Sequence, residues 1–413
     1  MNGILVGATA LVIARWLAQL WLAHLNQRHV RAHADAVPEA FRGVMDDATY
    51  AKSIRYTLAN SLFSQFEATF DLLVLLAVLF SGVLPWAFAK FDPQSVWAGA
   101  AFLFVVFVAL SFVSLPLQWW DQFRLEARFG FNTSTQATWW LDRVKGLLLG
   151  AVLGYPLLVL VLKCFAWAGN SWWLWAWAAM MAFQLLMSVL APVLILPLFN
   201  KLTPLPEGPL RDRLLALAQK TKFRAASIQV MDGSRRSKHS NAFFTGFGRL
   251  RKIVLFDTLI AQLAEPELEA VLAHEIGHWR RRHIVKMLVL SAAGSLIAFA
   301  ALAWLARQSW FAGAFGFPPA AGLAPVLVLF GLLAGVVLFW FSPLTHGLTR
   351  RYEYEADAFA KDVMRDAAPL VSALRKLNEK NLSNLTPHPF YSGFYYSHPT
   401  LVERERALLQ SQS

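Results

Sequence analysis

Residues 274–278 read His-Glu-Ile-Gly-His, which places two metal-binding side chains one helical turn apart. Side chains four positions apart share one face of an α-helix, so His274 and His278 can direct imidazole nitrogens at the same metal ion. Glu275 lies about 100° further round such a helix, where its carboxylate reaches the attacking water and not the metal. The spacing therefore predicts a metallopeptidase motif with Glu275 as general base; the alternative is a surface helix that carries two unrelated histidines.

A catalytic zinc site with an open position needs a third protein ligand. His283 lies close by in the sequence, but the metzincin pattern requires Gly and His where Arg281 and Ile284 stand. Site-two-type intramembrane proteases instead require an Asp from a later span, and the apolar run at 322–346 contains none. Neither pattern therefore completes the site.

A third candidate lies directly after the last apolar run, in a Glu-Tyr-Glu-Ala-Asp segment that starts at Glu353. Glu353 and Asp357 share a helical face, so Glu353 can bind zinc while Asp357 accepts the outer N–H of a ligand histidine. Glu355 points to another side of that helix, where a solvated, charged surface is the simpler interpretation. The nitrogen and oxygen ligands of His274, His278 and Glu353 favour one Zn²⁺ ion per chain.

The residues before the motif are typical of a helix N-terminus. Pro266 suits the first turn, and Glu267 and Glu269 place negative charge at the positive end of the helix dipole. We expect one helix from Pro266 to His283 that continues into the following apolar run.

The chain as a whole has the composition of a multi-span membrane protein. Of its 413 residues, 57% are apolar and 15% are charged, against about 45–50% and about 25% in an ordinary soluble domain. These values exclude a soluble globular protein, and the shortage of charge also excludes a disordered chain. Apolar runs long enough to cross about 30 Å of hydrocarbon as helices lie at 3–24, 72–89, 96–119, 146–168, 172–198, 284–306 and 322–346.

The basic residues alternate along the chain as the positive-inside rule requires. The loops 25–66, 120–145, 199–283 and 347–413 carry five, four, fifteen and nine Lys and Arg residues, whereas the loops between them carry almost none. This alternation predicts seven spans, with the N-terminus outside and the C-terminus and the motif on the cytoplasmic side. It also explains the net charge of +12 without nucleic acid as a partner, and the basic loops suit anionic membrane lipids.

The predicted fold is an all-α membrane protein of seven spans, with a cytoplasmic α+β protease domain that the last two spans divide. Its first part combines an amphipathic helix at 208–222 with β-like runs at 227–231, 242–245 and 252–256. Its second part is the tail, and both parts together have the size of one ordinary domain. The predicted organisation is five spans in 1–198, a protease segment in 199–283, two spans in 284–346, and a tail in 347–413 that completes the zinc site.

Several stretches resemble the type I CAAX prenyl proteases, a family of integral-membrane zinc metalloproteases in the gluzincin group. After its HExxH helix, that family has a Glu that binds zinc and an Asp four residues beyond this Glu. These two residues match Glu353 and Asp357. The resemblance implies a bundle of seven helices that encloses a chamber, with the zinc site open to it. Further matching stretches are LPLQWWDQFRLEARFGFN at 115–132, LPLFNKLTPL at 196–205, SKHSNAFFTGFG at 237–248, RKIVLFDTLI at 251–260 and SHPTLVER at 397–404.

Three further sites match the family. Asn241 and Ala242 would lie on the edge strand that pairs with a substrate backbone, the alternative being a turn before a strand. His398 matches a histidine near the metal, where a donor stabilises the oxyanion, or it is an ordinary surface histidine. Arg404 would bind a substrate carboxylate, although a role in holding a structural acid is favoured. The sequence departs from the family at His346, where we would expect Asn.

We therefore expect a zinc-dependent membrane endopeptidase that acts on peptides or proteins. The resemblance implies removal of the last three residues from a prenylated C-terminal CaaX sequence, with the isoprenoid chain in the apolar chamber. The residue usage is typical of a bacterium, which predicts the inner membrane, or the endoplasmic reticulum membrane in a eukaryote. A quality-control protease for misfolded membrane proteins is the alternative enzyme. A transporter or receptor with a structural metal site would need four protein ligands, and the sequence offers three.

Overall fold

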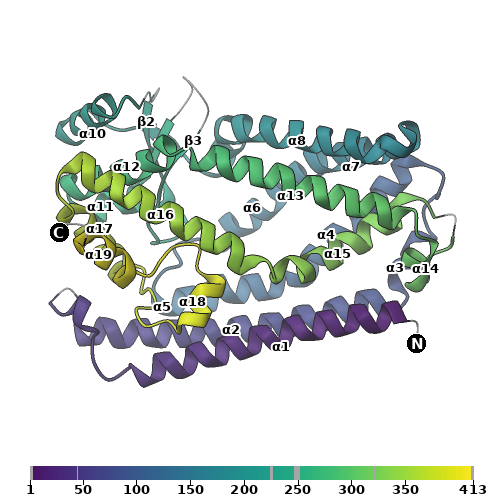
Figure 1. The fold of residues 1–413 in the computed structure, drawn as a ribbon, viewed down its shortest axis with the longest axis horizontal. Coiled ribbons are helices and arrows are strands. Elements are labelled where there is room, and N and C mark those ends of the chain that lie inside the picture. The colour runs from purple at the N-terminus through teal and green to yellow at the C-terminus, as the bar shows by residue number, and fades with distance from the viewer. Residues whose placement is uncertain (1–2, 44, 224–226, 246–251, 320, 411–413) are drawn as a thin grey trace.

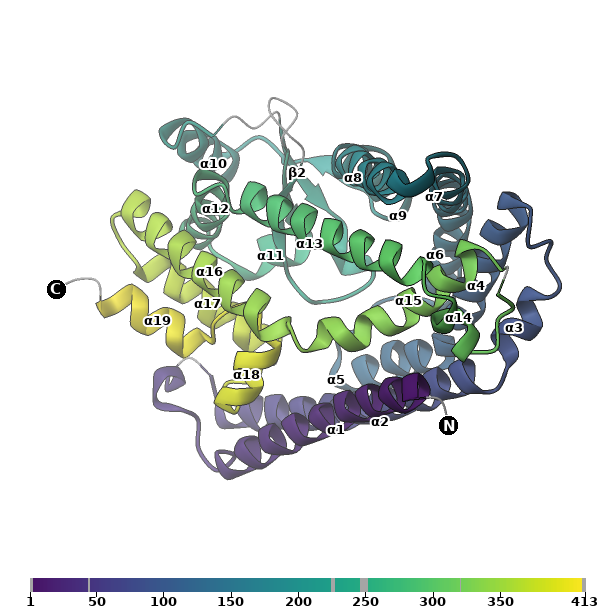
Figure 2. The same cartoon turned by 45° about the vertical axis from the view of Figure 1, so that its right-hand side comes forward.

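Long helices dominate the fold, and a small sheet lies near one end of the molecule (Figures 1 and 2). The structure is a computed structural model that describes residues 3–43, 45–223, 227–245, 252–319 and 321–410. The described chain starts at one end of the long axis and finishes near the other (Figure 1).

The apolar helices form two groups along the chain, separated by the sheet and its helices. The first group comprises α1 (Gly3–Ala32), α2 (Asp47–Phe80), α3 (Val83–Phe88), α4 (Val96–Trp120), α5 (Ala127–Phe129), α6 (Gln136–Leu149), α7 (Tyr155–Trp167), α8 (Trp172–Leu190) and α9 (Leu196–Phe199). The second group comprises α13 (His283–Ala306), α14 (Ser309–Ala314), α15 (Leu323–Phe339) and α16 (Ser342–Met364). The π-helical segments Asp121–Glu126, Gly150–Gly154 and Ala191–Ile195 join α4 to α5, α6 to α7 and α8 to α9.

The helices bear out a membrane protein with six to seven spans. Six helical segments are long and apolar enough to cross a membrane, and a seventh results if α15 and α16, which are bent by 61°, count as one span. Pro343 lies in the first turn of α16, where proline is compatible with a new helix but not with the continuation of α15. Large side chains such as Trp21, Leu73 and Val289 are more than half exposed, as surfaces that face lipid require.

The expected second span at 72–89 is not one helix in the structure. It is interrupted after Phe80, and Gly82 adopts a φ of 78° before α3 begins. The helix that contains its first part starts much earlier than expected, at Asp47. There the Asp46 carboxylate caps the helix by accepting a hydrogen bond from the backbone N–H of Thr49.

The helix expected from Pro266 into the following span is also two helices. α12 (Glu265–Arg280) ends at Arg280, and Arg282 has a φ of 58°, in the left-handed region. A left-handed residue is incompatible with a continuous right-handed helix, so α13 begins anew at His283. The break separates the helix that carries the histidine motif from the apolar helix that follows.

The sheet has four strands in the order β1-β2-β4-β3, and β3 forms one edge. β1 (Leu202–Pro204) runs antiparallel to β2 (Ser227–Met231), β2 runs parallel to β4 (Lys252–Phe256), and β4 runs antiparallel to β3 (Ala242–Thr245). The three predicted β-like runs are therefore strands, and β1 was not predicted. Within the matching stretches noted above, residues 246–248 and 251 lie outside the described residues.

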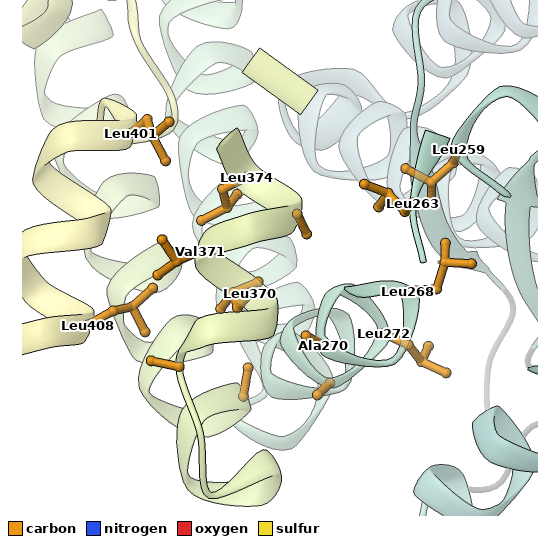
Figure 3. Close-up of a cluster of buried hydrophobic side chains, with 14 of the residues drawn as sticks. Leu259, Leu263, Leu268, Ala270, Leu272, Leu370, Val371, Leu374, Leu401 and Leu408 are labelled. Carbon is orange, nitrogen blue, oxygen red and sulfur yellow. The ribbon is translucent and has the colours of Figure 1, made fainter. Parts of the chain in front are cut away.

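One hydrophobic core joins segments that are far apart in the sequence (Figure 3). Buried leucines of α12 pack beside α17 (Ala368–Lys380), whose other side meets Leu401 and Leu408 of α19 (Leu401–Gln410). Burial of this shared apolar surface is the main force that holds the chain before α13 against the tail after α16. The remaining helices of this part are α10 (Pro209–Lys220), α11 (Asp257–Gln262) and α18 (Pro389–Tyr395).

Candidate metal centre

Helices α12 and α16 meet at a glycine in the middle of the histidine motif. A Cβ atom added to Gly277 would lie 3.0 Å from both the Cα and the carbonyl oxygen of Ala356. Glycine therefore allows the two backbones to approach more closely than any other residue would. This close packing brings His274 and His278 on α12 next to Glu353 on α16.

Three side chains from the two helices converge on one point. Nε2 of His278 lies 3.1 Å from Nε2 of His274 and 3.3 Å from Oε1 of Glu353, and Nε2 of His274 lies 3.5 Å from Oε2 of Glu353. Oε2 of Glu353 is buried and accepts no hydrogen bond from any described residue. Nη1 of Arg404 lies 3.5 Å from this oxygen but does not hydrogen-bond to it, and a buried carboxylate oxygen without a hydrogen bond is well placed to bind a metal ion. Two nitrogen ligands and one carboxylate therefore fit a divalent ion such as zinc.

Asp357 and Arg404 support the site from behind His274. Nδ1 of His274 lies 2.8 Å from Oδ1 of Asp357, which assigns the ring proton to Nδ1 and leaves Nε2 free for a metal. Arg404 is buried and donates from Nε to Oδ2 of Asp357 at 2.8 Å and from Nη2 to Oδ1 at 2.6 Å. Arg404 thus holds a structural acid, the role that the sequence favours, and its pairing with Asp357 argues against a contact with a substrate carboxylate.

Glu275 lies on α12 between the two histidines and is half-buried. Burial raises the pKa of its carboxyl group above the usual value, while positive charge on His274 and His278 acts in the opposite direction. A carboxylate with a raised pKa is a stronger proton acceptor than an ordinary one.

His398 borders the ligand cluster from the solvent side. Its Nε2 lies 3.4 Å from Oε1 of Glu353, its Nδ1 lies 2.9 Å from Oγ of Ser397, and 65% of its side chain is exposed. The histidine that departs from the family pattern, His346, lies elsewhere: its Nδ1 is 2.7 Å from the carbonyl oxygen of Phe394 in α18. Of the two, it is His398 that lies beside the ligand cluster.

Ala242 is the first residue of the edge strand β3, which packs against α12, and Asn241 directly precedes the strand. Oδ1 of Asn241 accepts a hydrogen bond from the backbone N–H of Ala242 at 2.8 Å. The carbonyl oxygen of Asn241 accepts from the N–H of Phe256 in β4 at 3.1 Å. The far side of β3 pairs with no strand among the described residues, so it presents an edge beside the motif helix.

Two residues that the sequence pattern did not assign to the site lie next to it. Nδ1 of His283, which fails as a third ligand in the metzincin pattern, lies 3.0 Å from Nδ1 of His278. Nε2 of His283 lies 3.0 Å from Oε2 of Glu355, for which a solvated surface was the simpler interpretation. On one continuous helix, His283 would point about 140° away from His278. Helical spacing therefore held no signal for this contact, which depends on the break at Arg282.

A hydrogen-bond network ties the loop before β3 to the first group of helices. Nε2 of His239 lies 3.2 Å from Oε2 of Glu126, and its Nδ1 lies 3.1 Å from Oδ1 of Asn381. The ring of Phe131 stacks on His239, and Tyr56 donates to the other oxygen of Glu126 at 2.6 Å. The hydrogen bond to Glu126 raises the pKa of His239. Glu126 and His239 lie in two of the stretches that match the family, but neither has a partner nearby in the sequence that would indicate this contact.

Two family models match adjoining parts of the chain. Residues 26–201 match the model described as the CAAX prenyl protease N-terminal region with five membrane helices. Residues 204–412 match peptidase family M48. The boundary between the two matches falls between the first group of helices and the segment that carries the sheet.

Curated relatives and a solved structure are similar over most of the chain. The chain is 36% identical over 400 residues to CAAX prenyl protease 1 of Saccharomyces cerevisiae, which covers 90% of this chain and 88% of the relative. It is 34% identical to the CAAX prenyl protease 1 homolog of Oryza sativa subsp. japonica, with 96% of each chain covered. The crystal structure of S. mikatae Ste24p matches with a TM-score of 0.91 at 32% identity, and covers 97% of this chain and 98% of that one.

Proposed function

This chain belongs to peptidase family M48, a metalloprotease family, and we propose that its metal is zinc and that it cleaves prenylated proteins with a C-terminal CaaX sequence. The observation that carries the proposal is the convergence of His274, His278 and Glu353 around a buried carboxylate oxygen that lacks a hydrogen bond. When bound, zinc supplies a Lewis acid that makes water a nucleophile at neutral pH.

The remaining side chains move or orient protons. Glu275 accepts a proton from the attacking water on its carboxylate and then delivers it to the nitrogen of the leaving amine. Asp357 keeps the ring proton of His274 on Nδ1, and Arg404 holds both oxygens of Asp357. His398 is the candidate donor to the oxyanion that forms on the scissile carbonyl, because its Nε2 lies beside the ligand cluster.

The substrate would bind in two parts. We place its peptide along the free edge of β3 at Asn241 and Ala242, where backbone hydrogen bonds would extend the sheet beside α12. The isoprenoid chain would occupy the apolar chamber that the resemblance implies among the spans. The reaction is then the removal of the last three residues, in keeping with relatives named CAAX prenyl protease 1.

We further infer seven spans, with the N-terminus outside and the active site and C-terminus in the cytoplasm. The alternation of basic loops supports this orientation. An odd number of spans is supported by the described chain, which starts and finishes at opposite ends of the long axis (Figure 1). The proposed divisions remain 1–198, 199–283, 284–346 and 347–413. The bacterial inner membrane and the endoplasmic reticulum membrane are both compatible with this orientation.

The test compares matched farnesylated and unmodified CaaX peptides, incubated with detergent-purified protein and with Glu275→Ala as the inactive control. Cleavage of the farnesylated peptide alone supports the proposal. Equal cleavage of both peptides would replace the prenylated substrate by the broader substrates of a quality-control protease. Absence of cleavage of either peptide by the zinc-loaded protein would contradict the proposal.

A further inference from the structure

A chain of hydrogen bonds leads away from the candidate ligand His278 to the surface of the protein. Nδ1 of His278 lies 3.0 Å from Nδ1 of His283, and Nε2 of His283 lies 3.0 Å from Oε2 of Glu355. We propose that His283 and Glu355 are positioning residues, which orient His278 and strengthen its binding of zinc. The proposal rests on the zinc site proposed above.

The ligand geometry determines the direction of these hydrogen bonds. Nε2 of His278 faces His274 and Glu353, so its lone pair is available to a metal and the ring proton must be on Nδ1. Nδ1 of His278 then donates to His283, whose own proton must be on Nε2. His283 in turn donates to Glu355, so both rings are neutral and each has a single tautomer.

Packing holds the ring of His283 in place, and two exposed cations border Glu355 without fixing it. The side chain of His283 is 4% exposed, and its ring stacks on Tyr352 with the centroids 4.2 Å apart and the planes within 10°. Arg351 donates to Oε1 of Glu355 at 3.1 Å, and Nζ of Lys286 lies 3.9 Å from Oε2. The ring of His283 therefore has little freedom to turn away from His278.

The outer ring nitrogen of each ligand histidine is thus connected to a carboxylate of α16, directly for His274 and through His283 for His278. His274 contacts Asp357 directly, one helical turn beyond Glu353. Glu355 lies two positions from Glu353, on nearly the opposite side of α16. An intervening imidazole connects it to His278, and the helix break before His283 makes that connection possible. A carboxylate at the outer nitrogen fixes the ring and makes the ligand more basic.

The test measures the zinc dissociation constant of the detergent-purified full-length chain by competition with a chromophoric chelator. His283→Phe keeps a ring that can stack on Tyr352 but removes the hydrogen-bond acceptor, and Glu355→Ala removes the carboxylate. We expect each variant to bind zinc about 10- to 100-fold more weakly than the wild type. The amide of His283→Gln can accept from His278 and donate to Glu355, so this variant should keep more of the affinity.

Arg351→Ala is the matched control. It removes an exposed ion pair on the far oxygen of Glu355 and leaves the bond from His283 in place, so its zinc affinity should equal that of the wild type. Thermal unfolding of the metal-free proteins separates lost folding from lost affinity, and equal unfolding temperatures with weaker zinc binding support the proposal.

Three results would overturn the proposal while leaving the zinc site intact. The first is a zinc affinity in His283→Phe and Glu355→Ala that equals that of the wild type. The second is an equal loss of zinc affinity in His283→Phe and His283→Gln. The third is zinc binding that weakens only in variants whose metal-free form unfolds at a lower temperature. If the wild type itself binds no zinc, the proposed function fails, and this inference fails with it. The wild-type measurement therefore distinguishes the two failures.

Discussion

Substitution of Gly277 by alanine tests whether the close packing of α12 and α16 positions the metal ligands. The added Cβ atom would lie 3.0 Å from the Cα and carbonyl oxygen of Ala356. Carbon atoms in favourable contact are about 3.5–4.0 Å apart, so the helices must separate by about 0.5 Å or more. The opposing atoms belong to the backbone, and no side-chain rotation removes the contact.

The substitution has two opposing effects on the free energy of unfolding. Alanine is favoured over glycine in a helix interior by about 0.8–1.0 kcal/mol. Overpacking of a close interface destabilises by about 1–3 kcal/mol, which leaves a net loss of up to about 2 kcal/mol. The metal site is more sensitive, because ligand distances tolerate only about 0.2 Å. Separation of the helices would move Glu353 away from both histidines, and we expect zinc binding to weaken by about 10- to 100-fold.

The assay measures zinc dissociation constants and peptide cleavage rates for the wild type, Gly277→Ala and Gly294→Ala. Among the described residues, a Cβ atom at Gly294, in α13, meets nothing within 4 Å beyond the adjacent backbone of its own helix, so this variant reports the replacement of a helical glycine alone. Equal zinc affinity in all three proteins would refute the reasoning. Full recovery in the double variant Gly277→Ala, Ala356→Gly would also refute it, because the contact involves backbone atoms that Ala356→Gly leaves in place.

Four further predictions concern catalysis, metal dependence, stability and pH. Glu275→Ala should keep about one zinc per chain by elemental analysis yet lose cleavage by about 10²- to 10⁴-fold, and full activity in this variant would contradict its role as general base. A chelator should abolish cleavage and added Zn²⁺ should restore it; cleavage that survives complete metal removal would exclude a metallopeptidase. Arg404→Met leaves the buried carboxylate of Asp357 without its main partner and should destabilise the fold by about 3–5 kcal/mol. The double variant Arg404→Met, Asp357→Leu should recover much of this loss in thermal unfolding. Equal unfolding temperatures for Arg404→Met and the wild type would contradict the pairing. Because Glu126 raises the pKa of His239, the protonated ring stabilises the fold below about pH 6.5, and this contribution disappears as the pH rises through the raised pKa. Glu126→Gln should therefore lower the unfolding temperature more at pH 6 than at pH 9, and an equal decrease at both would show that the charge of His239 has no part in it.

Periodicity and composition were sufficient to predict several parts of this protein. The spacing of four between His274 and His278, and again between Glu353 and Asp357, identifies pairs that share a helical face, because the helix period is a local property of the backbone. Apolar runs and the distribution of basic residues likewise identified a membrane protein, since transfer into lipid depends on the residues of each segment. The three predicted strands also matched the structure.

Which of these helical faces meet, and which side chains lie behind the ligands, depends on contacts between distant segments. Arg404 supports Asp357 because α19 packs on the shared core, and His283 reaches His278 because the chain breaks at Arg282. These contacts join residues from separate elements, or from two sides of a helix break. A helical period specifies the residues on a face but contains no information about the element that covers it. That choice depends on the burial of apolar surface across the whole fold, which no local spacing records.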